Sequence, residues 1–148
     1  MNPQTPVELR IGRQALTLLE AVLVVAAPEE GCALLLGGRD PWTVRRVWPC
    51  LNVWEPPAER RRRFALDPRE QLLAQKWARS RGLSVLGSAH SHPASEPVPS
   101  ALDRSLSFAP TLMLILGQGT PAGSPLSLAC WWLPEQGSPR RLAWRMDD

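Results

Sequence analysis

The sequence predicts a mixed α/β domain in which helices pack on a central sheet. Its 148 residues are a usual length for one domain, and the 44% of hydrophobic residues can form a substantial core. Short apolar segments typical of strands alternate along the chain with longer segments typical of helices. No internal repeat or long low-complexity tract divides the chain, so residues 1–148 are expected to form a single domain.

The chain is expected to begin with a strand followed by a helix. Val7–Ile11 alternates apolar and charged residues, as a half-buried strand does. A core-facing helix is predicted over Arg13–Ala26, before the break at Pro28. Apolar residues fall at helical spacing at Leu16, Leu19, Val22 and Leu23. This segment is too short to span a membrane and is interrupted by Glu20, so no membrane association is expected.

Strands are then predicted on both sides of a glycine pair. Gly31–Leu36 is short and apolar, which is typical of a buried strand, and Gly37-Gly38 is expected to end it. Trp42–Val53 is predicted as a second strand region, and Phe64–Leu66 as a short strand.

A second helix is expected to begin at Asp67 and Pro68. Aspartate can cap a helix, and proline is tolerated at the first helical position. The helix should run to about Arg81 and stop at Gly82. The next strand is predicted over Leu83–His90.

The last part of the chain is expected to contain a short helix and three strands. The helix should begin near Ser100 and end before Pro110. Loops are predicted over residues 117–125 and 134–139. The three strands are expected at Thr111–Leu116, Leu126–Leu133 and Arg140–Arg145.

The charge of the chain is only mildly basic, at +3, although Arg60–Arg63 forms a run of four arginines. Such a run can contact RNA or an acidic partner. Neither an aromatic ladder nor a nucleic-acid-binding motif accompanies it, so a solvated loop is the favoured interpretation. Nucleic acid is therefore not the expected partner.

Three widely spaced cysteines give no sign of a disulfide framework. Cys32, Cys50 and Cys130 are odd in number and form no C-x-x-C pair, which also argues against a cysteine zinc module. This usage fits a reducing compartment, and a cytoplasmic location is expected.

The chain has two histidines, and they stand two residues apart at His90 and His92. On a strand, this spacing points both rings to one face, whereas Ser91 faces the other way. Asp103 follows at the predicted helix start, where it could cap the helix as well as reach the histidines. Two imidazoles and one carboxylate leave a zinc ion one open position, as catalytic zinc sites require.

Hydrolysis at such a site also needs a general base that is not a metal ligand. Glu96 lies between the histidines and Asp103, and Glu29 and Glu30 lie just before a predicted buried strand. An acid that enters a dry cleft can have a raised pKa suited to proton transfer. The residue pattern itself does not choose among these three acids.

The histidine motif and its flanking residues resemble the JAMM (MPN-plus) metalloprotease signature. Glu30 is followed by His90-Ser91-His92, seven residues from Pro93 to Pro99, and Ser100-Ala101-Leu102-Asp103. The sequence around Glu30 is similar to the short bacterial members, and so are Asn52 and the segment Phe64–Pro68. The resemblance covers about residues 7–116 and is specific in the motif. One departure is Ala33, which replaces a glycine usual in that strand.

The resemblance implies a cytidine-deaminase-like fold with a mostly antiparallel central sheet flanked by helices. It also implies that His90, His92 and Asp103 bind zinc. Glu30 would be the general acid and base, with Glu29 as the alternative because of the departure at residue 33. Ser100 would form a hydrogen bond with the oxyanion that develops during hydrolysis or with the water.

The same resemblance implies a zinc metallopeptidase that cleaves the amide or isopeptide bond after the C-terminal Gly-Gly of a ubiquitin-like protein. A sulfur-carrier protein is the expected bacterial substrate. Two other functions remain open from the sequence. One is a non-catalytic scaffold that keeps the fold. The other is a nucleic-acid-associated relative, which the arginine run would suit.

Overall fold

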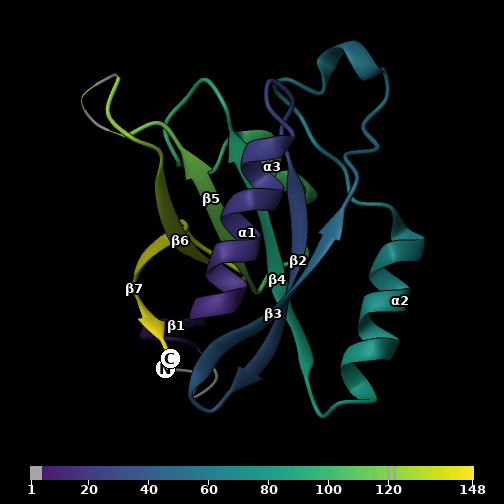
Figure 1. Cartoon of the computed structure of the whole chain (residues 1–148), viewed down its shortest axis with the longest axis vertical. Coiled ribbons are helices and arrows are strands. Elements are labelled where there is room, and N and C mark those ends of the chain that lie inside the picture. The colour runs from purple at the N-terminus through teal and green to yellow at the C-terminus, as the bar shows by residue number, and fades with distance from the viewer. Residues whose placement is uncertain (1–4, 120, 122) are drawn as a thin grey trace.

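Seven strands and three α-helices make up the computed structural model, which describes residues 5–119, 121 and 123–148 (Figure 1). The strands are β1 (Glu8–Gly12), β2 (Cys32–Arg39), β3 (Trp42–Cys50), β4 (Ser84–His92), β5 (Thr111–Gly117), β6 (Ser127–Leu133) and β7 (Arg140–Asp147). The helices are α1 (Arg13–Val25), α2 (Pro68–Arg79) and α3 (Ala101–Leu106), with a short 3-10 helix η1 (Pro57–Glu59). Residues 1–4 of the predicted domain, and residues 120 and 122 of the predicted loop 117–125, lie outside the described residues.

The strands close into a barrel in the order β1-β3-β2-β4-β5-β6-β7. Pairing is antiparallel for β2 with β3, β2 with β4, β5 with β6 and β6 with β7. It is parallel for β4 with β5 and for β1 with both β3 and β7. The mixed α/β class with a mostly antiparallel sheet is therefore confirmed. Closure through β1 is an addition that the sequence pattern did not predict.

Helix α1 packs on the inner face of the barrel and forms the main core with it. In Figure 1, α1 lies across the front of the strands. Its apolar stripe of Ala15, Leu19 and Leu23 is buried, as the helical spacing predicted. These side chains join one cluster with inward-facing strand residues that include Leu9, Ile11, Ala33, Leu35, Val44, Ala89, Leu112, Leu114 and Cys130.

The opposite, outer face of the strands is covered in part by α2. Ala74 and Ala78 of α2 are buried against Leu34 and Leu36 of β2. The N-cap of this helix is Asp67, whose side chain accepts a hydrogen bond from the Arg69 backbone, as predicted. Because side chains alternate between faces, β2 supplies both the inner core and this outer cluster.

The predicted strands differ from the structure at several points, and β4 runs to His92 where the prediction ended at His90. Phe64–Leu66 is not a strand, because the Ala65 N–H donates to the Asn52 side chain and not to a neighbouring strand. The strand predicted over Trp42–Val53 ends at Cys50. Gly37 does not end β2, which continues to Arg39. The glycine is instead needed for strand pairing, because a Cβ at residue 37 would lie 1.8 Å from the Thr43 carbonyl oxygen of β3.

Within the residues that the structure describes, no helix combines the length and apolar character needed to cross a bilayer.

Candidate metal centre

Strands β2 and β4 place three of the predicted site residues on the outer face of the barrel. In the antiparallel register, Cys32 lies opposite His90. Glu30 precedes Cys32 by two residues, and His92 follows His90 by two, so all these side chains share one face. Ser91 faces the other way, as expected. Its Oγ accepts a hydrogen bond from the Gly31 backbone at 2.8 Å, which fixes the approach to Glu30.

The start of α3 brings the fourth site residue to the same place. Ser100 is the N-cap, and it forms a capping box with Asp103. The Asp103 N–H donates to Ser100 Oγ at 3.0 Å, and the Ser100 N–H donates to Asp103 Oδ2 at 2.9 Å. The same Oδ2 lies 3.0 Å from His90 Nε2 and 3.1 Å from His92 Nε2. Asp103 therefore caps its helix and also joins the histidines.

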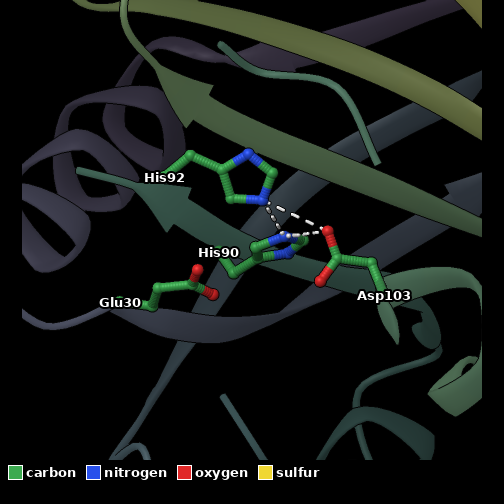
Figure 2. Close-up of side chains that lie close together, drawn as sticks. All are labelled: Glu30, His90, His92 and Asp103. Atoms are coloured by element: carbon green, nitrogen blue, oxygen red, sulfur yellow. Dashed lines mark hydrogen bonds and ion pairs between the residues drawn. The ribbon is translucent and has the colours of Figure 1, made fainter. Parts of the chain in front are cut away.

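Glu30, His90, His92 and Asp103 form a buried cluster in which one ligand atom from each residue lies within 4.8 Å of the others. The two Nε2 atoms are 3.1 Å apart. Figure 2 shows Asp103 and Glu30 approaching the two imidazole rings from opposite sides. Each of the four residues is at most 7% exposed. Such a set of residues could hold a metal ion.

The donor atoms of the three closest residues fit a cation. The His92 Nδ1–H donates to the Glu96 carbonyl at 2.8 Å, so His92 Nε2 presents a lone pair. Asp103 Oδ2 is also an acceptor, and both atoms face His90 Nε2 at 3.0–3.1 Å. Ligands at about 2.0–2.1 Å from a zinc ion are separated by little more than this distance. A cation would satisfy all three atoms at once.

Burial and mutual contacts shift the pKa values of this cluster. Burial lowers the pKa of His90. For His92, burial also lowers the pKa, but contacts to Asp103 and the Glu96 carbonyl outweigh it and leave a net increase. Burial raises the pKa of Asp103, yet the two histidines and the Ser100 N–H hold it well below its usual range. Asp103 is therefore an anion, as a metal ligand must be.

Comparison with known proteins gives the family. A model of prokaryotic homologs of the JAB domain matches residues 13–134. The chain belongs to this family. A desampylase of Haloferax volcanii is 43% identical over 77 residues, which are 52% of this chain and 53% of that protein. A probable TtuB-protein conjugate cleaving protease of Thermus thermophilus is 37% identical over 95 residues, which are 64% of this chain and 60% of that protein. The matched segments thus span little more than half of these two relatives.

Solved structures show the same fold. The solution structure of a Desulfitobacterium hafniense protein has a TM-score of 0.79 and 31% identity, and the match covers 95% of this chain and 93% of that one. A JAB1/MPN domain protein of Archaeoglobus fulgidus has a TM-score of 0.53 at 23% identity, covering 95% of this chain and 99% of that one. The latter likeness shows the fold alone.

Of the three acids that the sequence left open, the JAB-family fold brings Glu30 into the cluster. Its side chain is 5% exposed, and its Oε1 has no hydrogen-bond partner among the described residues. Burial, partly offset by His92, raises its pKa to about 7. Glu29 is half-buried and outside the cluster. Glu96 has an exposed side chain and contributes its backbone carbonyl to His92.

The peptide groups of Glu30 are held by the segment that follows β3. The Glu30 N–H donates to the Arg60 carbonyl at 2.7 Å, and the Asn52 amide donates to the Glu30 carbonyl at 3.0 Å. The same segment places Phe64 on the His90 ring, with centroids 4.3 Å apart. Sequence reasoning gave Asn52 and Phe64 no role at the site. Their likeness to short bacterial members was the only signal available.

Two residues of the Arg60–Arg63 run stabilise their own loop. Arg60 donates to the Trp54 carbonyl at 2.8 Å and pairs with Glu55 at 3.2 Å. Arg63 pairs with Glu59 at 3.3 Å. These contacts agree with the expectation of a solvated loop for this run.

A cavity of about 660 Å³ opens beside the cluster in this JAB-family domain. It lies between α2, α3 and the segment after β3, and Asp103 forms part of its wall. Its lining includes Trp54, Phe64, Leu66, Gln71, Gln75, Ser88, Leu106 and Phe108. Asp103 therefore belongs both to the wall of this cavity and to the buried cluster.

Proposed function

We propose that this chain is a zinc-dependent peptidase or isopeptidase that cleaves the amide bond after the C-terminal Gly-Gly of a ubiquitin-like or sulfur-carrier protein. The observation that carries this proposal is the buried cluster, in which Glu30 lies beside three donor atoms separated by 3.0–3.1 Å. The names of the Haloferax and Thermus relatives support action on protein conjugates.

His90, His92 and Asp103 would hold the zinc ion through two imidazole nitrogens and one carboxylate oxygen. Three protein ligands are the usual number in a catalytic zinc site, because the fourth position then stays open. When bound, zinc supplies Lewis-acid polarisation of a carbonyl group and lowers the pKa of water.

Glu30 would act as the general base and then as the general acid. Its pKa of about 7 suits both tasks near neutral pH. The carboxylate takes a proton from the attacking water as the new carbon–oxygen bond forms. It then gives that proton to the departing amine nitrogen as the amide bond breaks.

Ser100 would stabilise the oxyanion. Its Oγ accepts the Asp103 N–H at 3.0 Å, which fixes the oxygen and leaves the hydroxyl hydrogen free to donate. The cavity beside Asp103 would receive an extended C-terminal tail of the carrier protein. Glycine residues suit the point of cleavage, because they let the tail backbone approach the buried cluster closely.

A cleavage assay on two variants tests the assigned roles. The substrate is a sulfur-carrier protein with a C-terminal amide adduct, and mass spectrometry detects the product with and without chelator. We expect Glu30→Gln to keep about one zinc per chain but to lose at least about 100-fold in turnover, because it cannot transfer the proton. His92→Ala should lose both zinc and turnover.

Glu29→Gln is the matched control, since it removes a neighbouring acid outside the cluster and should leave turnover close to wild type. Undiminished turnover by Glu30→Gln would contradict the role of Glu30. A wild-type protein that binds no zinc, or cleaves equally in chelator, would contradict the metallopeptidase and favour a scaffold.

A further inference from the structure

We infer that Trp131 and Gly117 are positioning residues for the metal centre, and that they act through residues 93–99, here called the motif loop. They hold this loop so that its Glu96 carbonyl fixes the ring of His92. The inference rests on the proposed function, because it takes His92 to be a metal ligand. It adds two residues from β5 and β6 that lie outside the histidine and aspartate motif.

Three consecutive carbonyl groups of the motif loop each accept a hydrogen bond from a donor on a different residue outside the loop. The Ser95 carbonyl accepts the Gln118 N–H at 2.8 Å. The Glu96 carbonyl accepts His92 Nδ1–H at 2.8 Å. The Pro97 carbonyl accepts the Trp131 indole N–H at 2.9 Å. The carbonyl that orients His92 is therefore held on both sides by bonds to the barrel.

Gly117 lets the loop lie directly on the end of β5. It is the register partner of His92 in the parallel β4–β5 pair. A Cβ at this position would lie 2.7 Å from Pro97 N, 2.8 Å from the Ser95 carbonyl oxygen and 3.0 Å from the Glu96 carbonyl carbon. These contacts are with backbone atoms, so any side chain at residue 117 would push the loop away from the strand.

The indole of Trp131 is itself fixed in place. Its ring packs against a separate small hydrophobic cluster formed by Met113, Ile115 and Leu133. The Arg141 guanidinium lies over it, 5.6 Å from the ring centroid. A donor held by this packing can position the Pro97 carbonyl without a large entropy cost.

This arrangement sets both the tautomer and the direction of the His92 ring. A carbonyl oxygen can only accept, so it keeps the hydrogen on Nδ1 and leaves Nε2 as the free donor atom for a metal. Partners of this kind around metal-binding histidines commonly change metal affinity by about 10- to 100-fold when removed. Loss of the contacts that Trp131 and Gly117 make with the motif loop should therefore weaken zinc binding while the barrel remains folded.

Trp131→Phe tests the inference, because it keeps an aromatic ring but removes the indole N–H. Trp144→Phe is the matched control: its indole also donates to a strand carbonyl, that of Leu128, at 3.2 Å, but away from the motif loop. We expect zinc affinity, measured by competition with a chelator, to fall about 10-fold in Trp131→Phe. Trp144→Phe should stay within about twofold of wild type.

Two further measurements separate positioning from general stability. At a pH high enough to keep the His92 ring neutral, nitrogen NMR of the metal-free protein should show mainly the Nδ1–H tautomer in wild type and Trp144→Phe, and a mixture in Trp131→Phe. Gly117→Ala should weaken zinc binding more than Trp131→Phe, because it displaces the loop backbone. Thermal unfolding of each metal-free variant reports whether it is folded.

The outcomes distinguish this inference from the proposed function. If wild type binds zinc and Trp131→Phe matches it in affinity and tautomer, the inference is wrong and the proposed function stands. Equal losses in Trp131→Phe and Trp144→Phe would also overturn it, since the effect would then be one of general stability. A wild-type protein that binds no zinc overturns both.

Discussion

At the scale of single residues, the ionisation of Glu30 affects the stability of the metal-free protein. Its carboxyl is buried at the end of a strand, and its pKa is raised to about 7 from 4.5. The folded chain therefore keeps a proton on Glu30 at pH values where the unfolded chain has lost it. Stability that depends on this group is present below about pH 4.5 and is lost as the pH rises to about 7.

Replacing Glu30 by glutamine should reveal this dependence. In chelator-treated protein, we expect the variant to gain stability over wild type as the pH increases from 4.5 to 8, because glutamine has no charge to bury. The gain should be about 3 kcal/mol, because each unit of pKa shift corresponds to about 1.36 kcal/mol. Urea unfolding of both proteins at several pH values measures it. A difference that stays constant with pH would show that Glu30 ionises normally in the folded chain.

The candidate metal ligands could be predicted from the residue pattern, whereas the choice of Glu30 among three acids rested on the family resemblance. His90 and His92 share a face because strand residues alternate, and Asp103 begins a helix whose cap is visible in the sequence. Glu30 comes from a segment 60 residues earlier than His90. Only the β2–β4 register brings the two together, and register depends on long-range pairing that local pattern does not encode.

At the scale of elements, the pairing of β4 with β5 leaves no room for a side chain at Gly87. Gly87 sits where a Cβ would be 2.1 Å from the Leu112 carbonyl oxygen. No side-chain rotation relieves such a contact, because the obstructing atom belongs to the backbone of β5. The spacing of these two strands therefore depends on the absence of a side chain at residue 87.

Gly87→Ala should consequently destabilise the fold by about 3 kcal/mol. Gly38→Ala is the matched control, since a Cβ at Gly38 meets nothing within 4 Å. The control should change stability by less than about 1 kcal/mol. Chemical denaturation measures both variants. Similar midpoints for the two would contradict the close approach of β4 and β5.

The observed elements agree with the sequence prediction where a local signal, such as a cap, a proline or apolar spacing, determines them. Asp67 and Pro68 begin α2, and the apolar spacing of α1 matches its buried stripe. Phe64–Leu66 has the composition of a strand but not its pairing, because the Asn52 side chain takes the place of a neighbouring strand. A side chain that substitutes for backbone pairing leaves no periodic signal.

At the scale of the whole molecule, the candidate metal centre joins parts of the chain that are far apart in sequence. Glu30 precedes β2, the histidines end β4, and Asp103 lies in α3. A ligand that binds only the folded arrangement stabilises it by mass action. Metal binding should therefore be visible as a change in the stability of the entire domain.

Zinc at about 100 times its dissociation constant should stabilise the protein by about 2.7 kcal/mol. For a chain of this size, we expect an increase in Tm of roughly 5–10 °C. Differential scanning calorimetry with zinc and with chelator measures it. His92→Ala should show no such increase, and an equal increase in that variant would place zinc elsewhere on the molecule.

The mixed α/β class could be predicted, but barrel closure could not. Val7–Ile11 was recognised as a strand from its alternation, and β1 is close to it. Its parallel pairing with both β3 and β7 connects distant parts of the chain. Alternation shows which face of a strand is buried, but it carries no information about which strands are its neighbours.

The alternation at the tip of β4 has a consequence for how this gene can change. His90 and His92 serve the outer face while Ser91 ties the inner side to Gly31. Deleting one codon between Gly87 and Ala89 would rotate the following residues by half a period, turning the serine outward and both imidazoles inward. The length of this strand is therefore as strictly constrained as the identity of its histidines.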